Sequence, residues 1–372
     1  MSPQVLPSRN PFTASFGVPS DLTYVGRQPE LDDFLTGLQE QPGSTHRSIT
    51  IAGPRGVGKT SLLAVMMDHA KAQGWVTAAV TAGPGIEERI LDKASLQAES
   101  LLDPKPKRLL TGISIAGFSL QSQAIPEGTP SWWRRVNTLL DVLESRGSGL
   151  VIAVDEVHRD EPALRPLFQQ YQELVNDRRN VAMVMAGLPD AVSNVLTEYS
   201  LTFVQRAWRQ NLGPIDITLI CDAYITAFSG SGKQISVDLA SEAAQHSQGL
   251  PYLYQLIGYF TWRAAGSSDT VTAEHLGAAL PQAQATAGQN LYGLELRALT
   301  ARERDFLYAM TPDSDFSTVA DIAQRLATSQ NNIYYYRNRL VAHGLILPSP
   351  PGGMRFTSAA LRDYLRSGAM QE

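Results

Sequence analysis

The stretch IAGPRGVGKTSLL, residues 51–63, is the most informative segment of this chain. Gly53, Gly58, Lys59 and Thr60 occupy every fixed position of the pattern G-x-x-x-x-G-K-[ST]. Glycines let successive backbone N–H groups turn inward around an anion, and a helix that begins at such a loop adds its positive N-terminal end. The apolar run before the loop predicts a strand, and the residues after it predict a helix. Pattern and context together predict a loop that binds nucleotide phosphates.

The residues of this loop have distinct predicted roles. Lys59 is expected to reach the β- and γ-phosphates, Thr60 to bind Mg²⁺, and Ser61 to lie near the α-phosphate. The other expected nucleotide contacts within the loop are Gly53, Pro54, Arg55, Gly56, Val57 and Gly58.

An acidic pair follows about a hundred residues downstream, in LVIAVDEVH (150–158). Five apolar residues predict a buried strand, and Asp155 and Glu156 stand at its end. Asp155 is expected to hold the metal through its water shell, and Glu156 to orient or deprotonate the attacking water. Glu156 and Lys59 are therefore the predicted catalytic residues, and Thr60 and Asp155 the predicted metal-binding residues.

Strands and helices alternate around these motifs. Continuous apolar runs predict strands, and apolar residues at spacings of three and four predict helices, which together indicate an α/β core with three layers and a parallel sheet. Residues 83–130 are expected to be irregular. The predicted strands are 47–53, 75–82, 149–158 and 180–189, and the predicted helices are 28–39, 59–74, 132–147 and 163–177.

From about residue 215 the pattern becomes helical, and the last segment predicts three helices followed by two strands around a Pro-Gly-Gly turn. That order is typical of a winged helix-turn-helix. The expected division is an extended N-terminal segment (1–20), a P-loop ATPase core (21–213), a helical lid (214–296) and a winged helix-turn-helix domain (297–372).

Composition excludes several classes of protein. The chain has 372 residues, a net charge of −5 and a single cysteine, Cys221, so a disulfide framework and a cysteine-rich metal site are both excluded. The N-terminus lacks the basic and apolar regions of a signal peptide, and no apolar run approaches the length of a membrane span. A cytoplasmic protein without membrane contact is the expectation.

Further motifs resemble the AAA+ and STAND-type P-loop ATPases, especially the branch that contains origin-recognition proteins. Val25-Gly26-Arg27 resembles the motif that this family places near adenine, and Gly249-Leu250-Pro251 resembles the start of its lid helix. The resemblance implies nucleotide contacts by Gly26, Arg27 and Pro251, and it implies ATP as the nucleotide. The segment 203–216 resembles the passage into the lid, where such proteins carry an arginine; Arg206 and Arg209 are the candidates for an arginine finger or sensor.

Two positions depart from the AAA+ pattern. Gly187-Leu188 stand where the sensor strand usually ends in Asn or Thr, and no arginine lies beside Gly249-Leu250-Pro251. Both departures favour the STAND branch, and they make nucleotide binding a firmer expectation than hydrolysis.

The third helix predicted in the tail carries residues suited to base and phosphate contact. From residue 297 onward there are nine arginines and seven acidic residues, a weak basic excess for a DNA-binding domain. A protein–protein interaction module is therefore the alternative for this unit. The candidate DNA contacts are Asn331, Asn332, Arg337 and Arg339.

These observations predict an ATP-binding, ATP-hydrolysing regulatory switch in which nucleotide state controls the lid and the winged helix. Two alternatives remain open: a DNA-binding ATPase of origin-recognition type, and a nucleotide-gated interaction module without significant turnover. Expected partners are ATP, duplex DNA through the winged helix, and a protein partner or further copies of the chain.

Overall fold

A computed structural model describes residues 9–14, 23–102, 131–158, 161–198, 205–314, 316–349 and 352–367. The chain forms two compact units. We call residues 28–52 and 59–211 the sheet unit, and residues 1–27, 53–58 and 212–372 the helical unit.

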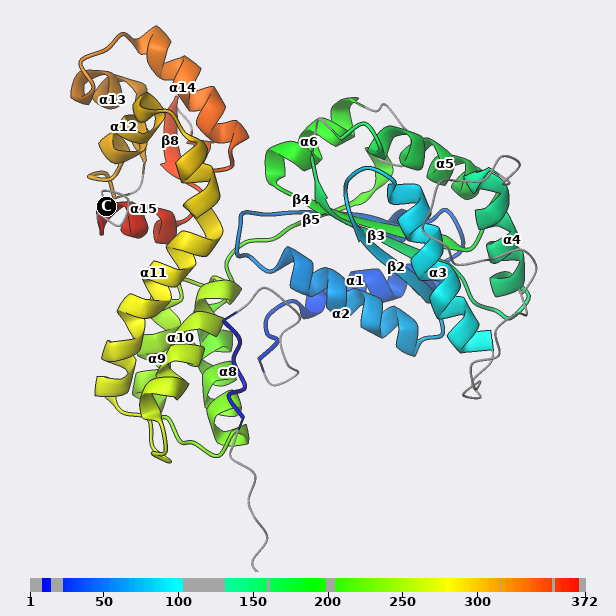
Figure 1. Cartoon of the computed structure of the whole chain (residues 1–372), viewed down its shortest axis with the longest axis horizontal. Helices are drawn as coiled ribbons and strands as arrows, with labels where there is room; N and C mark the ends of the chain where they lie inside the picture. Colours follow the sequence, from blue (N-terminus) through cyan, green and yellow to red (C-terminus); the bar gives the residue numbers. More distant parts are fainter. Residues whose placement is uncertain are drawn as a thin grey trace, which may run out of the picture. The chain divides into compact units, whose positions relative to one another are not determined.

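The sheet unit is built on five parallel strands in the order β2-β3-β4-β1-β5 (Figure 1). The central strands are continuous apolar runs because both faces of the sheet are covered. The predicted parallel α/β fold is confirmed. The strands are β1 (Ser48–Ala52), β2 (Val76–Thr81), β3 (Leu150–Val157), β4 (Val181–Gly187) and β5 (Trp208–Asn211).

Helices cover both faces of this sheet (Figure 1). Alternate strand residues, such as Ile152 and Met183, join one apolar core with α3 (Ile86–Leu102), α4 (Trp132–Glu144) and α5 (Leu164–Asn176). The opposite face carries α2 (Lys59–Ala72), whose buried side chains include Leu62 and Met66. The remaining elements of the unit are α1 (Gln28–Gln39), the short 3₁₀ helix η1 (Thr45–Arg47) and α6 (Pro189–Glu198).

Helix α3 corrects one expectation, because residues 86–102 were predicted to be irregular. Ile86, Ile90, Ala94 and Ala98 recur at a spacing of four and are all buried, as one face of an amphipathic helix requires. The rest of the segment predicted as irregular, residues 103–130, lies outside the described residues.

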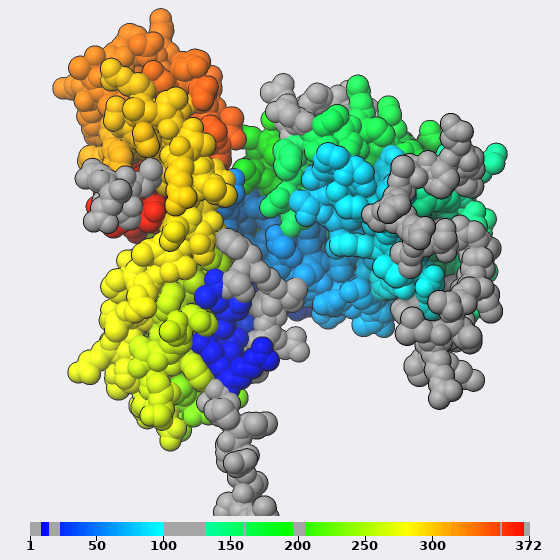
Figure 2. Space-filling model, viewed as in Figure 1, coloured from blue at the N-terminus to red at the C-terminus, as the bar shows by residue number. Residues whose placement is uncertain are grey.

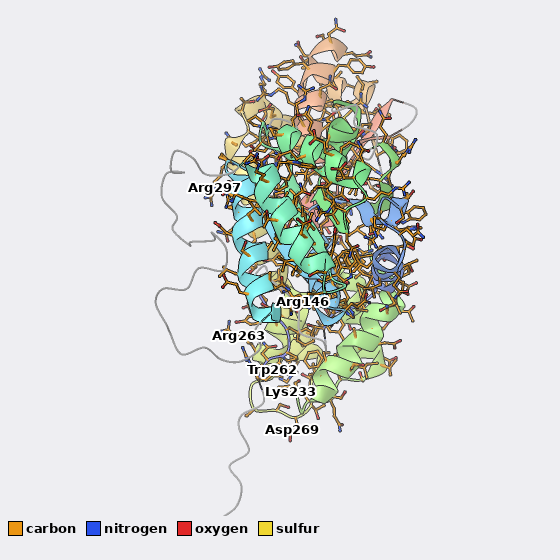
Figure 3. All side chains as sticks on the ribbon, turned by 90° about the vertical axis from the view of Figure 1, so that its right-hand side faces the viewer. Arg146, Lys233, Trp262, Arg263, Asp269 and Arg297 are labelled. Carbon is orange, nitrogen blue, oxygen red and sulfur yellow. The ribbon has the colours of Figure 1, made fainter. Side chains whose placement is uncertain are left out.

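Four helices form the first part of the helical unit: α8 (Ile217–Gly230), α9 (Val237–His246), α10 (Pro251–Ala265) and α11 (Ala273–Ala298). The side chains of Asp216, Ser236 and Thr272 cap the N-termini of α8, α9 and α11. Lys233 is buried here because its ammonium group donates to the carbonyls of Gly266 and Ser268 and lies over the ring of Trp262 (Figure 3).

Residues 9–14 lie against these helices (Figure 2). Phe12 belongs to the apolar core that the helices form. The Phe12 ring is 3 % exposed and lies 5.1–5.8 Å, between ring centroids, from Tyr224, Phe228 and Tyr254. Gly258 provides the space, because a Cβ at this position would overlap the ring of Phe12. The predicted N-terminal segment, 1–20, is otherwise outside the described residues.

The C-terminal part of this unit contains helices and a three-stranded antiparallel sheet in the order β6-β8-β7. Its last helix, which the sequence analysis did not predict, packs on α11: the Tyr364 ring lies against Gly288, and the Tyr292 and Ser358 hydroxyls are 2.6 Å apart. The winged helix-turn-helix assignment of this part stays a prediction, as do the four domain boundaries. The elements are α12 (Ala301–Met310), β6 (Ser317–Thr318), α13 (Val319–Arg325), α14 (Gln330–Ala342), β7 (Ile346–Ser349), β8 (Gly353–Phe356) and α15 (Ala359–Arg366).

Among the described residues, no helix combines the length and the apolar character that crossing a membrane requires.

Candidate functional site

The loop 53–58 needs its glycines for identifiable reasons. Gly56 has φ +75° and Gly58 has φ +93°, in the left-handed region that strains any residue with a Cβ. A Cβ at Gly53 would lie 2.8 Å from a methyl of Val57 and 3.0 Å from the carbonyl oxygen of Leu212. The loop is therefore tightly turned and closely packed, as binding of phosphate by backbone N–H groups requires.

Two helices of the helical unit contact this loop. The backbone N–H of Tyr252, in the first turn of α10, donates to the Gly56 carbonyl at 3.2 Å. Pro251 lies 3.4 Å from the position of a Cβ on Gly58, and Leu291 of α11 lies 3.1 Å from that of a Cβ on Gly56. The predicted Gly249-Leu250-Pro251 motif therefore does open a helix, and that helix begins against the phosphate loop.

Arg27 has a structural position that the sequence resemblance did not indicate. Its guanidinium group is buried and donates to the carbonyls of Val57, at 3.2 Å, and Gly213, at 2.5 Å. Gly26, with φ +75°, packs so closely on Ile215 that a Cβ would overlap that side chain. Arg27 thus links the phosphate loop to the segment that precedes α8.

In the sheet unit, the hydroxyl of Thr60 donates to an oxygen of Asp155 at 2.6 Å. Thr60 lies in the first turn of α2 and Asp155 lies near the end of β3, so 95 residues of sequence separate them. Lys59, the first residue of α2, is half-buried. A hydroxyl and a carboxylate are the hard oxygen ligands that Mg²⁺ prefers, and Mg²⁺ commonly takes only one or two protein ligands beside phosphate and water.

Glu156 has an unusual backbone conformation. Its φ is +54°, and the pairing of β3 with β4 shifts register between Val154 and Val157. Its N–H donates to the second carboxylate oxygen of Asp155 at 2.8 Å, and its side chain is exposed. Strained backbone of this kind is concentrated at functional sites, and here it coincides with the shift in strand pairing between Val154 and Val157.

The end of β4 adds a carboxylate that the sequence analysis did not single out. A Cβ on Gly187 would lie 2.7 Å from the Val157 carbonyl oxygen, so glycine is needed where an AAA+ sensor residue was sought. Three residues further, Asp190 is half-buried in the first turn of α6, and this burial raises the pKa of its carboxyl group. An acidic residue just after a buried strand was the available signal.

The other predicted residues are dispersed. Arg206 is exposed, and Arg209 is exposed on the edge strand β5. Asn331 and Asn332 are exposed in the first turn of α14, and the Asn332 amide donates to the Thr328 hydroxyl at 3.1 Å.

Arg337 and Arg339 lie further along α14. Arg337 is half-buried. The Arg339 side chain, 46 % exposed, pairs with Glu303, whose side chain is 1 % exposed. Arg339, a predicted DNA contact, thus already forms an ion pair within the chain.

The phosphate-loop motif follows β1 and the acidic pair lies on β3, with β4 between these two strands in the sheet. This arrangement is that of the P-loop AAA+ fold. Residues 23–184 match the model of the AAA ATPase domain, and this match confirms the predicted resemblance to AAA ATPases. Residues 289–365 match a second model, a domain of unknown function (DUF8462). A comparison with curated protein sequences gives no match.

Solved structures from archaea share the fold. The Walker-type ATPase PABY2304 of Pyrococcus abyssi is 18 % identical, with a TM-score of 0.64 over 91 % of this chain and 95 % of that chain. The Aeropyrum pernix ORC2 protein in ADPNP–ADP complexes is 12 % identical, with a TM-score of 0.59 over 95 % and 98 %. At these identities the likeness establishes the fold alone.

Proposed function

We propose that this protein binds ATP with Mg²⁺ and hydrolyses it, and that nucleotide state controls the position of its C-terminal part. The observation that carries this proposal is the 2.6 Å contact between Thr60 and Asp155. It joins the hydroxyl of the phosphate-loop motif to the carboxylate of the acidic strand, the two protein groups that the metal needs.

Each residue has a proposed task. The backbone N–H groups of residues 53–58 surround the phosphates, and Lys59 neutralises the β- and γ-phosphates. Thr60 and Asp155 hold Mg²⁺, which when bound supplies charge neutralisation between the phosphates. Glu156 holds the attacking water in line and accepts its proton.

The switch follows from the contacts of the loop. Gly56 touches both α10 and α11, and α11 continues toward the part that contains α12 to α15. A nucleotide that fits one arrangement of these helices better than another shifts the population between them. The proposal also includes membership of the STAND branch and a cytoplasmic location. It further includes a role of Arg206 and Arg209 toward a second copy of the chain.

Association with duplex DNA is the second candidate, and the comparisons favour it over a switch that acts through protein partners alone. The Aeropyrum pernix ORC2 protein is similar in fold, and Asn331, Asn332 and Tyr335 are exposed on α14. Asn side chains are suited to adenine, whereas Arg339 must leave Glu303 before it can bind phosphate.

The test is ATP binding and phosphate release by the full chain. Lys59→Ala is expected to abolish binding of Mg·ATP, and Glu156→Gln to bind it without turnover. Lys71→Ala is the matched control, because Lys71 is an exposed lysine on the same helix and pairs only with nearby Asp68 among the described residues. Equal ATP affinity in wild type and Lys59→Ala would refute the site; binding without release in the wild type would favour the module without turnover.

The DNA candidate needs a separate titration of a labelled duplex, with and without Mg·ATP. Arg337→Ala and Arg339→Ala are each expected to weaken binding, and Arg302→Ala, an exposed arginine on α12, serves as control. Duplex affinity that is equal in all four proteins counts against DNA contact through α14.

A further inference from the structure

A charged contact joins the phosphate loop to α11. Nη2 of Arg55 lies 2.6 Å from Oε1 of Glu295, and the two side chains are 36 % and 19 % exposed. Arg55 is the second of the four variable residues of the loop. Glu295 lies in the last turn of α11, so 240 residues of sequence separate the two.

The ion pair belongs to a larger contact between α11 and the loop. Leu291, four residues before Glu295 and hence on the same face of the helix, packs over Gly56. The Nε atom of Arg55 is buried, and within the part of the chain that the structure describes it has no acceptor. The Nε–H group of Arg55, beside the loop, is therefore available to donate a further hydrogen bond.

We propose that the Arg55–Glu295 ion pair is a latch that nucleotide phosphates open by competing with Glu295 for Arg55. This inference rests on the proposed function, because it assumes that the loop binds a nucleoside triphosphate. Phosphate oxygens attract the guanidinium group and repel the carboxylate, and both effects favour the state in which the pair is broken. ATP then binds the latched and unlatched states unequally, which is the requirement for a ligand-driven change.

The same helix carries the change to the C-terminal part. Gly288 and Tyr292 lie two turns and one turn before Glu295, and they contact Tyr364 and Ser358 at α15. Opening of the latch thus acts on the segment of α11 that also holds α15.

Glu295→Gln tests the latch because it keeps the shape of the side chain and removes its charge. Affinity for Mg·ATP, measured by calorimetry on the full chain, is expected to increase about two- to five-fold, the range for a partly exposed ion pair. The matched control is Glu274→Gln, which removes the same charge from the exposed first turn of the same helix. Equal affinity in Glu295→Gln and Glu274→Gln, or weaker binding by Glu295→Gln, overturns the proposal.

A double-mutant cycle with Arg55→Gln separates competition from a general charge effect. Glu295→Gln is expected to change ATP affinity in the wild-type background and to leave it unchanged in the Arg55→Gln background. The same increase in both backgrounds contradicts a latch through Arg55.

Hydrogen exchange without nucleotide separates failure of the latch from failure of the proposed function. Glu295→Gln is expected to accelerate exchange of the amides in α11 after Gly288, whereas Glu274→Gln is not. If the wild type binds no ATP, the proposed function fails, and unchanged exchange in Glu295→Gln still refutes the latch itself.

Discussion

Two glycines of α11 are expected to respond in opposite directions to the same substitution. Gly277 is exposed and a Cβ there meets no atom within 4 Å, so Gly277→Ala gains helix propensity, about 1 kcal/mol of stability. Gly288 is buried against the ring of Tyr364, and a Cβ would overlap that ring. Overpacking of this kind costs about 1–3 kcal/mol, which equals or exceeds the propensity gain.

The net expectation for Gly288→Ala is a loss of about 0–2 kcal/mol, so the two variants differ by about 1–3 kcal/mol. Hydrogen exchange of the amides in α11 and α15 is the assay, because it resolves local stability in a chain of two units that need not unfold together. Gly288→Ala is expected to reduce protection of α15, and Gly277→Ala to leave it unchanged or raise it.

A second change distinguishes the clash from any other effect of the alanine. Tyr364→Ala removes the ring, so adding Gly288→Ala to that variant is expected to stabilise α11 as Gly277→Ala does. If Gly288→Ala stabilises α11 in the wild-type background to the same extent, the packing of Tyr364 on α11 is refuted, and with it the contact that joins α15 to the proposed latch.

Three further predictions concern other parts of the molecule. Phe12→Ala is expected to lower the local stability of the helices that bury it by about 3–5 kcal/mol. Phe316→Ala, at a residue 44 % exposed, is expected to have little effect. Equal rates of amide hydrogen exchange in these helices of the two variants would contradict the docking of residues 9–14. In thermal unfolding, Glu156→Gly is expected to be about 1 kcal/mol more stable than Glu156→Ala, because alanine retains the backbone strain of φ +54° and glycine does not. Higher stability of Glu156→Ala would contradict a strained backbone at this residue. Burial opposes ionisation of Glu303, but hydrogen bonds from Thr300 and Arg339 outweigh it and hold the pKa of Glu303 below its ordinary value of 4.5. The ionised carboxylate therefore stabilises the folded chain above pH 4.5, and this stabilisation is lost as the pH falls below that value. Melting curves are expected to show a smaller loss of stability on acidification for Glu303→Gln than for the wild type.

Much of the sheet unit could be predicted because its signals are local. The phosphate loop is one run of eight residues, and each strand of the core is a short apolar segment, so neighbours in sequence suffice to recognise them. Asp155 was recognisable because an acidic pair directly follows such a segment. Helix α3 had an equally clear spacing of four, but it was grouped with the residues that follow it and was predicted as irregular.

The sequence by itself determined the phosphate loop, the acidic strand and the alternation of strands and helices, since each depends on residues that are close along the chain. Only the tertiary structure decided the partners of Arg27, Arg55, Phe12 and Gly288. The chain has 36 acidic residues, and nothing local distinguishes Glu295 from the others as the partner of Arg55. Contacts between residues far apart in sequence depend on how the whole chain packs, because packing selects among many side chains of equal chemistry.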